Sequence, residues 1–417
     1  MKKDNLKSII VLFSCCLVVA LLLAAINLVT APIIEENNEQ ARLAALNGLI
    51  PNADYDEKKD LVGIPESISG IFVDKNGGGV AITFSATSQY SNGPMQYAVG
   101  IDMDGKVISI KEIFYMESRD FGSYPDSFIG KEYADIDQVD AVGDVTYSSN
   151  AFKSGLKDAY TAFYAAIGGE LKKTELDILN TLVEDASFKQ IESQAQLVSE
   201  ITAIYRANAL TYAFRYTDGD NVYLVVADIF GKVVATAVYE GDENATVPTD
   251  FVTQAAKEIV SAEIVGKVLT DSTDFELLEA ESKENTVKMN IAHTGERSFT
   301  ARSLAVFKTA DGYAVLVESQ GYAAVASSGE PIVLAVGFDN DGKITKTHVI
   351  SHAETQKFGG DKVINNAEYT DKYIGLDEIP DSVSGFMDAG AYATYSYTGY
   401  HNGVRVAYLA LSAIISK

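Results

Sequence analysis

Residues 93–122 read GPMQYAVGIDMDGKVISIKEIFYMESRDFG, and residues 330–359 read EPIVLAVGFDNDGKITKTHVISHAETQKFG. The two stretches align without a gap, which indicates an internal repeat and therefore two copies of one structural unit. The residues that both copies share include Pro94/Pro331, Gly100/Gly337, Asp102/Asp339, Asp104/Asp341, Gly105/Gly342, Lys106/Lys343, Glu117/Glu354 and Phe121/Phe358.

Each copy predicts a small antiparallel sheet. Runs rich in Val, Ile and aromatic residues at Met95–Asp102 and Val107–Phe114 flank Asp104-Gly105. An Asp-Gly pair is a strong hairpin signal, because Gly adopts positive φ at no steric cost. The second copy has the same signal at Asp341-Gly342. Further apolar runs precede the two copies at 80–84 and 313–318.

Helical segments follow both predicted sheets. Asn150–Tyr164 has apolar residues at helical spacing, and Gly403–Ile414 is similarly apolar. Strands followed by a helix predict α+β modules with a helix packed on a sheet. Residues 223–240 (YLVVADIFGKVVATAVYE) repeat the strand–turn–strand pattern, so we expect a decayed third copy over about 200–260.

Composition limits the chemistry that the chain can perform. The 417 residues carry a net charge of −25, which argues against a nucleic-acid partner because phosphate binding needs a basic surface. The only cysteines are Cys15 and Cys16, both inside an apolar stretch. The rest of the chain therefore has no thiol for a disulfide, a zinc–thiolate site or an iron–sulfur cluster. Redox work there requires an organic cofactor or a metal without thiolate ligands.

The N-terminus predicts a membrane anchor. Ser8–Ile26 has no charge, and about 20 such residues span a bilayer as a helix. Lysines precede this stretch and glutamates follow it, so the N-terminus is expected in the cytoplasm and the rest outside. A cleaved signal peptide ending near Ala24-Ala25 and a lipoprotein modified at Cys15 or Cys16 are the alternatives. Ile33–Leu49 then predicts a short amphipathic helix.

The segment that leaves this stretch, NLVTAPIIEENNEQARLAALNGLIP at 27–51, resembles the opening of Rnf-type G subunits and their sodium-pumping relatives. The match rests on Asn27, Thr30, Pro32, Asn37, Ala41, Arg42 and Pro51. A generic single-pass anchor with an Ala-rich stalk is the alternative interpretation.

A Thr/Ser segment precedes each predicted helix, DAVGDVTYSS at 140–149 and DAGAYATYSY at 388–397. Both resemble the FMN-binding domain family, in which the segment reads roughly D-x-x-S-G-A-T-x-S/T. The resemblance implies that a flavin transferase joins FMN to the Thr through a phosphoester. A second shared feature is H-x-E-T…G, present here at His352–Thr355 and Gly359.

Both segments depart from the family pattern. Ser-Gly-Ala is replaced by Gly143-Asp-Val145 in the first copy and by Ala391-Tyr-Ala393 in the second. The second copy keeps its Ala and the H-x-E-T set, which ranks Thr394 slightly above Thr146 as the attachment site. The alternative is that both segments only cap helices, as Ser and Thr commonly do. Equally, Glu117 and Glu354 could contact the flavin or its segment, or could be solvated charges at strand ends.

The resemblance implies a membrane-anchored, extracytoplasmic FMN carrier in electron transfer, similar to Rnf-type G subunits and coupled through its partners to ion translocation. Those partners would be integral-membrane subunits and a flavin transferase. A scaffold protein that has lost its flavin, or an electron-transfer flavoprotein outside such a complex, are the alternatives. The candidate cofactor-binding residues are Thr394, Thr146, Asp388, Asp140, Ser396, Ser148, Glu354, Glu117, His352 and Thr355.

The predicted fold is α+β, with a single N-terminal transmembrane helix followed by tandem modules of a small antiparallel sheet plus a helix. The predicted divisions are a cytoplasmic tail (1–8), a transmembrane helix (9–30), a stalk helix (31–55), a first FMN-binding-like module (56–170), a middle region (171–295) and a second module (296–417). Asn244-Ala-Thr246 mimics the flavin segment near the third copy but is predicted to be a loop, and His401 is expected at the surface or at a helix start.

Overall fold

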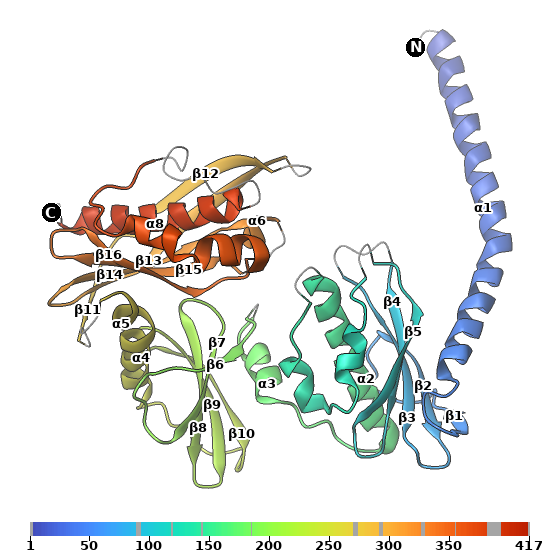
Figure 1. Ribbon diagram of the computed structural model, residues 1–417. Coiled ribbons are helices and arrows are strands. Elements are labelled where there is room, and N and C mark those ends of the chain that lie inside the picture. The colour runs from blue at the N-terminus through green and yellow to red at the C-terminus, as the bar shows by residue number, and fades with distance from the viewer. Residues whose placement is uncertain are drawn as a thin grey trace. The chain divides into compact units, whose positions relative to one another are not determined.

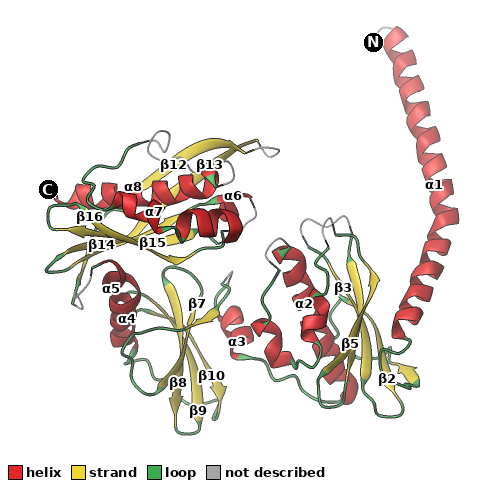
Figure 2. Ribbon diagram, viewed as in Figure 1, coloured by secondary structure: helices red, strands yellow, loops and turns green. Residues whose placement is uncertain are grey.

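The computed structural model describes residues 3–88, 93–117, 120–142, 145–184, 186–269, 274–291, 295–326, 330–354, 356–381 and 393–415. These residues form two compact units, Met1–Lys172 and Lys173–Lys417. Helices and antiparallel sheets alternate along the chain (Figure 2), as the α+β prediction requires.

The first unit contains one long helix and a five-stranded antiparallel sheet on which a second helix packs (Figure 1). Its elements are α1 (Lys3–Leu46), β1 (Tyr55–Glu57), β2 (Ile68–Asp74), β3 (Val80–Ala86), β4 (Met95–Ile101), β5 (Val107–Phe114), the 3₁₀ turns η1 (Tyr124–Phe128) and η2 (Tyr133–Gln138), and α2 (Thr146–Ile167). The strands lie in chain order across the sheet. Phe84 and Phe152 meet in the core between the sheet and α2, with ring centroids 5.7 Å apart.

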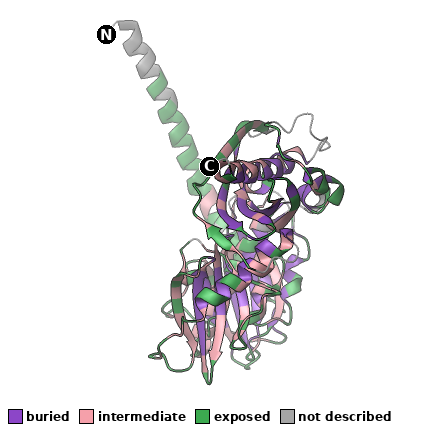
Figure 3. Ribbon diagram, turned by 90° about the vertical axis from the view of Figure 1, so that its left-hand side faces the viewer, coloured by how far each residue is buried: buried purple, intermediate pink, exposed green. Residues whose placement is uncertain are grey.

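Helix α1 runs unbroken through Pro32, whereas the sequence predicted a transmembrane helix and a separate stalk helix. A proline removes one backbone hydrogen bond, but the helix-forming residues on both sides allow the helix to continue. Its stretch from Cys16 to Leu46 is long and apolar enough to cross a membrane. Figure 3 shows this helix exposed along much of its length.

The last turn of α1 is attached to the sheet. Leu46 is buried with Leu49 and Phe72 on the sheet face that α2 does not cover. Arg42 donates a 3.0 Å hydrogen bond to the Ser69 carbonyl and lies 5.5 Å above the Phe72 ring. The end of the apolar helix is therefore a structural part of the first sheet.

The second unit begins with a helix and a second five-stranded antiparallel sheet, whose strand order is β10-β9-β8-β7-β6. Its elements are α3 (Glu175–Leu182), β6 (Lys189–Ile191), β7 (Ile201–Arg206), β8 (Thr211–Asp218), β9 (Asn221–Asp228), β10 (Val233–Glu240), and the continuous helical stretch α4 (Val252–Val260), η3 (Ser261–Val265) and α5 (Gly266–Val268). Leu179 of α3 packs on one face of this sheet with Tyr205, Leu224 and Val226.

A third antiparallel sheet follows, with order β11-β13-β14-β15-β16 and an extra strand, β12, paired to β13. Its elements are β11 (Glu276–Leu278), β12 (Glu284–Ile291), β13 (Gly295–Lys308), β14 (Gly312–Ser319), α6 (Tyr322–Ala326), β15 (Ile332–Asp339), β16 (Ile344–Ser351), the π-helical η4 (Gln356–Ile364), α7 (Ala367–Thr370), η5 (Asp371–Tyr373) and α8 (Thr394–Ile415). Helix α8 covers one face of this sheet, and β12 with the first part of β13 forms a ribbon beside α8.

The helical stretch α4–α5 serves two sheets at once. Ile264 and Val265 are fully buried in one core with Phe214 of the second sheet and Leu316 of the third. The layers of the second unit are therefore α3, the second sheet, α4–α5, the third sheet and α8. One hydrophobic core joins the middle region to the C-terminal module.

All three sheets share the same turn. The side chains of Asp102, Asp228 and Asp339 each accept two hydrogen bonds of 2.8–3.0 Å from the backbone of the turn between their fourth and fifth main strands. The glycine three residues later has φ between +83° and +85° in every copy. Each sheet also has three register shifts at equivalent places. One lies in its second main strand, between Ile68 and Gly70, between Ile201 and Ala203, or between Ser303 and Ala305. The other two lie where its last strand, β5, β10 or β16, pairs with the strand before it. The middle sheet thus repeats the geometry of the other two.

Candidate functional site

Both threonines proposed for flavin attachment begin a helix. Thr146 is the first residue of α2 and Thr394 is the first residue of α8. The cap position of α2 is Val145, which makes no side-chain capping bond, and Ala393 accepts the backbone bond from Tyr397 at the start of α8. Neither apolar cap can satisfy the N–H groups of the first turn, which are the groups that bind phosphate at a helix N-terminus. The threonines therefore do not occupy the capping position.

Glu354 connects the start of α8 to the start of α6. Its carboxylate is 6% exposed and accepts a hydrogen bond from the Ser396 hydroxyl. The other carboxylate oxygen accepts a 3.0 Å bond from the Ala323 N–H. A Cβ on Gly321 would lie 2.9 Å from the carboxylate carbon, and a Cβ on Gly359 would lie 2.7 Å from the oxygen bonded to Ser396. Only glycine leaves room for the carboxylate at these two places.

Burial raises the pKa of Glu354, and the bonds from Ser396 and Ala323 act in the opposite direction. His352 helps to hold the segment, because its Nδ1 accepts a 3.1 Å bond from the Glu354 N–H. Burial lowers the pKa of His352, against the charge of Glu330. The H-x-E part of the motif is thus one local unit in which the histidine orients the backbone of the glutamate.

The first module contains the same contact. Glu117 accepts bonds of 2.9 Å from Ser148 and 2.8 Å from Ser88 on one carboxylate oxygen. Its other oxygen is buried and has no hydrogen-bond partner among the described residues. Both repeat-equivalent glutamates therefore contact the serine two positions after the candidate threonine, and neither is a solvated strand-end charge.

Pro380 and Asp381, which precede the second Thr/Ser segment, are attached to α8 by residues that the sequence did not single out. His401 is 2% exposed, contrary to its expected surface position. It lies two turns into α8, on the side that packs against Tyr373 of η5. Its Nε2 donates to the Pro380 carbonyl at 3.0 Å, so its Nδ1 accepts from the Tyr373 hydroxyl at 2.9 Å. Arg405, one turn further along α8, forms an ion pair with Asp381, the residue after Pro380.

The first module has a similar ion pair, 2.6 Å long, between Lys157 of α2 and Asp137. Lys157 and Arg405 stand at the same distance from the first residue of their helices. In both modules, therefore, a basic residue of the helix holds the chain before it returns to the candidate threonine. A basic residue at this helix position was the signal that could have revealed the contact.

The remaining candidates are placed as follows. Asp140 is exposed before α2, whereas Asp388 and Thr355 lie outside the described residues, as does the side chain of Thr146. Asn244-Ala-Thr246 lies in the irregular segment between β10 and α4, as predicted, and not at a helix start.

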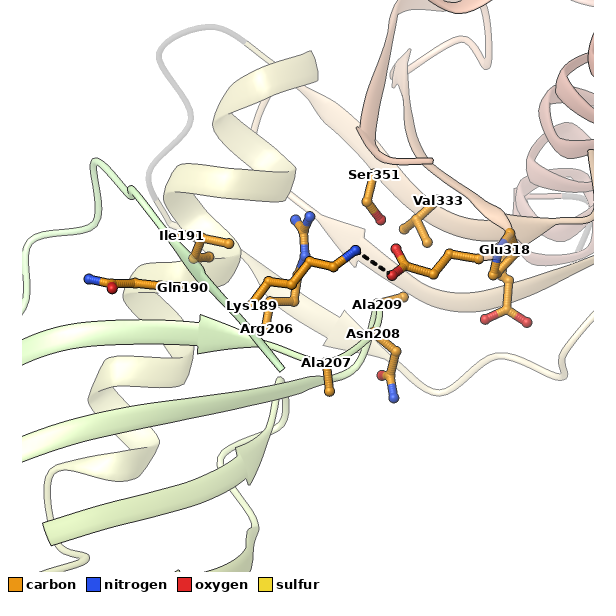
Figure 4. A pocket seen from close by; sticks show the side chains of 12 residues that line it. Lys189, Gln190, Ile191, Arg206, Ala207, Asn208, Ala209, Glu318, Val333 and Ser351 are labelled. Atoms are coloured by element: carbon orange, nitrogen blue, oxygen red, sulfur yellow. Dashed lines mark hydrogen bonds and ion pairs between the residues drawn. The ribbon is translucent and has the colours of Figure 1, made fainter. Parts of the chain in front are cut away.

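A cavity of about 180 Å³ lies elsewhere in the second unit, between the edge of the second sheet and the third sheet. An ion pair of 2.8 Å between Lys189 and Glu330 crosses it, and the dashed line from Lys189 in Figure 4 marks this contact. Arg206 and Glu318 also line it, so its charges are balanced. The lining includes none of the residues around Glu354, and we do not assign it to the flavin site.

The arrangement suits FMN. Each module offers a threonine at a helix start, a first helical turn whose backbone N–H groups suit a phosphate, and a glutamate that bonds to the serine two positions later. The model of the FMN-binding domain matches residues 91–161 and 328–409, which contain these two constellations. The chain thus contains two FMN-binding domains, which supports FMN as its cofactor.

A second match extends this assignment. The model of the RnfG N-terminal region matches residues 1–49, which comprise α1 and the turn after it. Taken together, the matches support an RnfG-like flavin-binding electron-transfer protein. No curated protein matches the sequence.

Proposed function

We propose that this chain carries FMN covalently on Thr394, on Thr146 or on both, and passes electrons between membrane subunits of an Rnf-type complex whose electron flow drives ion translocation. The observation that carries the proposal is the repeated contact of a glutamate, buried at Glu354 and partly buried at Glu117, with the serine two residues after each threonine. A contact retained in two diverged domains indicates a requirement on the shape of that segment.

The residues of the chain position the cofactor, and FMN supplies reversible electron transfer when bound. Glu354 fixes the first turn of α8 through Ser396, while His401 and Arg405 hold Pro380 and Asp381, which precede the segment in the chain. The first-turn N–H groups and the positive end of the helix dipole favour the negatively charged phosphodiester. A flavin held in this way would be tethered to the chain at its phosphate.

Helix α1 supports a membrane location for this carrier. An uncleaved anchor with its N-terminal lysines in the cytoplasm would place both FMN-binding domains outside, where a flavin transferase would load them. The attachment of the last turn of α1 to the first sheet would keep the first domain close to the membrane surface. The partners in this proposal are the integral-membrane subunits of the complex.

The test is intact mass and in-gel flavin fluorescence of the full-length chain, co-expressed with a flavin transferase. Thr146→Ala, Thr394→Ala and the double variant are compared with Thr246→Ala, a control in the loop of the middle region. We expect one FMN of added mass for each functional threonine, lost in the matching variant and retained in the control. No added mass in the unsubstituted chain would refute covalent attachment and favour a scaffold that has lost its flavin.

A further inference from the structure

Three aromatic rings form a ladder beside Thr394. Tyr395 lies nearly parallel to Phe299, at 7° and 6.0 Å between ring centroids, and to Tyr322 on its other side, at 23° and 5.9 Å. Phe299 is fully buried and Tyr322 is 40% exposed. The ladder therefore runs from the core to the surface and ends in an exposed tyrosine ring.

The rings of the ladder are held in place. The Tyr395 hydroxyl donates a 3.0 Å bond to the Asn290 carbonyl in β12, and Phe299 lies opposite Val287 in the ribbon of β12 and β13. Asn402 of α8 fastens the same ribbon through bonds of 3.0 Å to the carbonyls of Asn285 and Phe299. The inner two rings thus have a fixed orientation.

Tyr322 is held against α8 by the site already described. The next residue along, Ala323, donates its N–H to Glu354, which also binds Ser396 of α8. Gly399 permits a close approach of the two segments, because a Cβ there would lie 2.6 Å from the Gln320 carbonyl oxygen. Glu354 therefore sets the position of the outer ring relative to the helix start that carries Thr394.

The first FMN-binding domain differs from the second in sequence and in strand length where this ladder is built. The strand pairings make Ala86 equivalent to Ser319, so by sequence Gln89 is the equivalent of Tyr322. β2 has no counterpart of the N-terminal extension of β13 that carries Phe299.

We propose that Tyr322 is a stacking platform for the isoalloxazine ring of the flavin on Thr394, with Tyr395 and Phe299 holding the platform rigid. The inference rests on the proposed function and adds a positioning residue to it. Thr394 is adjacent to Tyr395, and the Tyr395 and Tyr322 ring centroids are 5.9 Å apart. This separation is about one helical turn, so an isoalloxazine ring at the end of a ribityl chain on Thr394 would reach Tyr322. Planar aromatic systems gain from such offset stacking.

The flavin of the second domain would then be restricted in its motion and its fluorescence quenched by the adjacent phenol.

The experiment uses the full-length, flavinylated chain in detergent, in a Thr146→Ala background so that only the second domain reports. Flavin fluorescence lifetime and steady-state anisotropy are measured for this parent and for Tyr322→Ala and Tyr322→Phe. Phe230→Ala, which removes an exposed ring from the β9–β10 turn, is the matched control. Intact mass establishes flavin loading and circular dichroism establishes folding for each variant.

We expect Tyr322→Ala to lower the stacked fraction by roughly threefold or more, seen as a longer mean lifetime and a lower anisotropy. Tyr322→Phe should retain the parental anisotropy, and Phe230→Ala should match the parent in both quantities. A loaded, folded Tyr322→Ala variant with parental lifetime and anisotropy would overturn the platform and leave the proposed function intact. Absence of FMN mass from the parent would overturn attachment at Thr394, and the platform with it.

Discussion

At the scale of single residues, the most informative side chain is Glu354, a buried acid that links two helices through one carboxylate. A buried carboxylate is stable only when its oxygens are satisfied, and here one hydroxyl and one backbone N–H supply the bonds. Removal of the acid leaves both donors without their acceptor. We therefore expect Glu354 to affect the conformation of the flavin segment more than it affects the charge of that segment.

Glu354→Ala should lower the free energy of unfolding by about 1–3 kcal/mol, the typical result of leaving buried polar groups unsatisfied. Glu354→Gln keeps an acceptor for Ala323 and a donor for Ser396, so its loss should be smaller. Because burial raises the pKa of Glu354 in the folded chain, ionisation there opposes folding. The stabilising contribution of the protonated acid is present below its unfolded pKa and is lost as the pH rises through its folded pKa.

Stability of Glu354→Gln relative to the unsubstituted chain should consequently increase from pH 4.5 to pH 8, as measured by urea unfolding of the second unit within the full-length protein. Glu117→Gln in the first domain provides the comparison at the equivalent position. Equal stability of Glu354→Ala and the unsubstituted chain would show that the carboxylate has no structural role.

The sequence identified Glu117 and Glu354 as equivalent, and Ser148 and Ser396 as equivalent, from the repeat alone. It could not show that each glutamate bonds to its serine, because 31 residues separate the first pair and 42 the second. His401 was misplaced for a related reason. Its neighbours in the core come from η5 and α7, which the sequence pattern did not predict.

At the scale of elements, hairpins were predictable and packing was not. Asp-Gly pairs between β-branched runs located the turns of the first and third sheets, because local backbone geometry determines them. The extra strand β12 lacks such a signal, and the continuous α1 depends on flanking residues that outweigh Pro32. The contact of α8 with the segment before α6 depends on a single glycine.

Gly399→Ala tests that contact by the sign of its effect. Alanine in the middle of a helix normally stabilises by about 1 kcal/mol relative to glycine. At Gly399 the new methyl group would lie 2.6 Å from the Gln320 carbonyl oxygen and 2.8 Å from the Gly321 Cα, so α8 must move. We expect a loss of about 1–3 kcal/mol in the free energy of unfolding, as for other overpacked sites. A gain in thermal stability would show that α8 does not press on this backbone.

At the scale of the whole molecule, the repeated turn and register shifts lead us to infer that the chain contains three copies of one module. The middle copy retains the sheet but has only residues 241–251 between its last strand and its helix, where the others have 115–145 and 352–393. The flavin segment has no room there. The middle copy instead contributes its helix to a core shared with the second FMN-binding domain.

This shared core predicts that residues 173–417 unfold as one cooperative body. Ile264 is fully buried between the second and third sheets, so Ile264→Ala should cost about 2–5 kcal/mol and weaken both sheets together. Hydrogen exchange followed by mass spectrometry should show faster exchange in β8 and in β14 to a similar extent, with the first sheet unchanged. Ile136→Ala, at a fully buried position of the first unit, should have the converse effect. Faster exchange in β8 without any change in β14 would mean that the middle copy is an independent domain, and the rigid support that it gives to the flavin-bearing helix would then have to come from the third sheet and α8 alone.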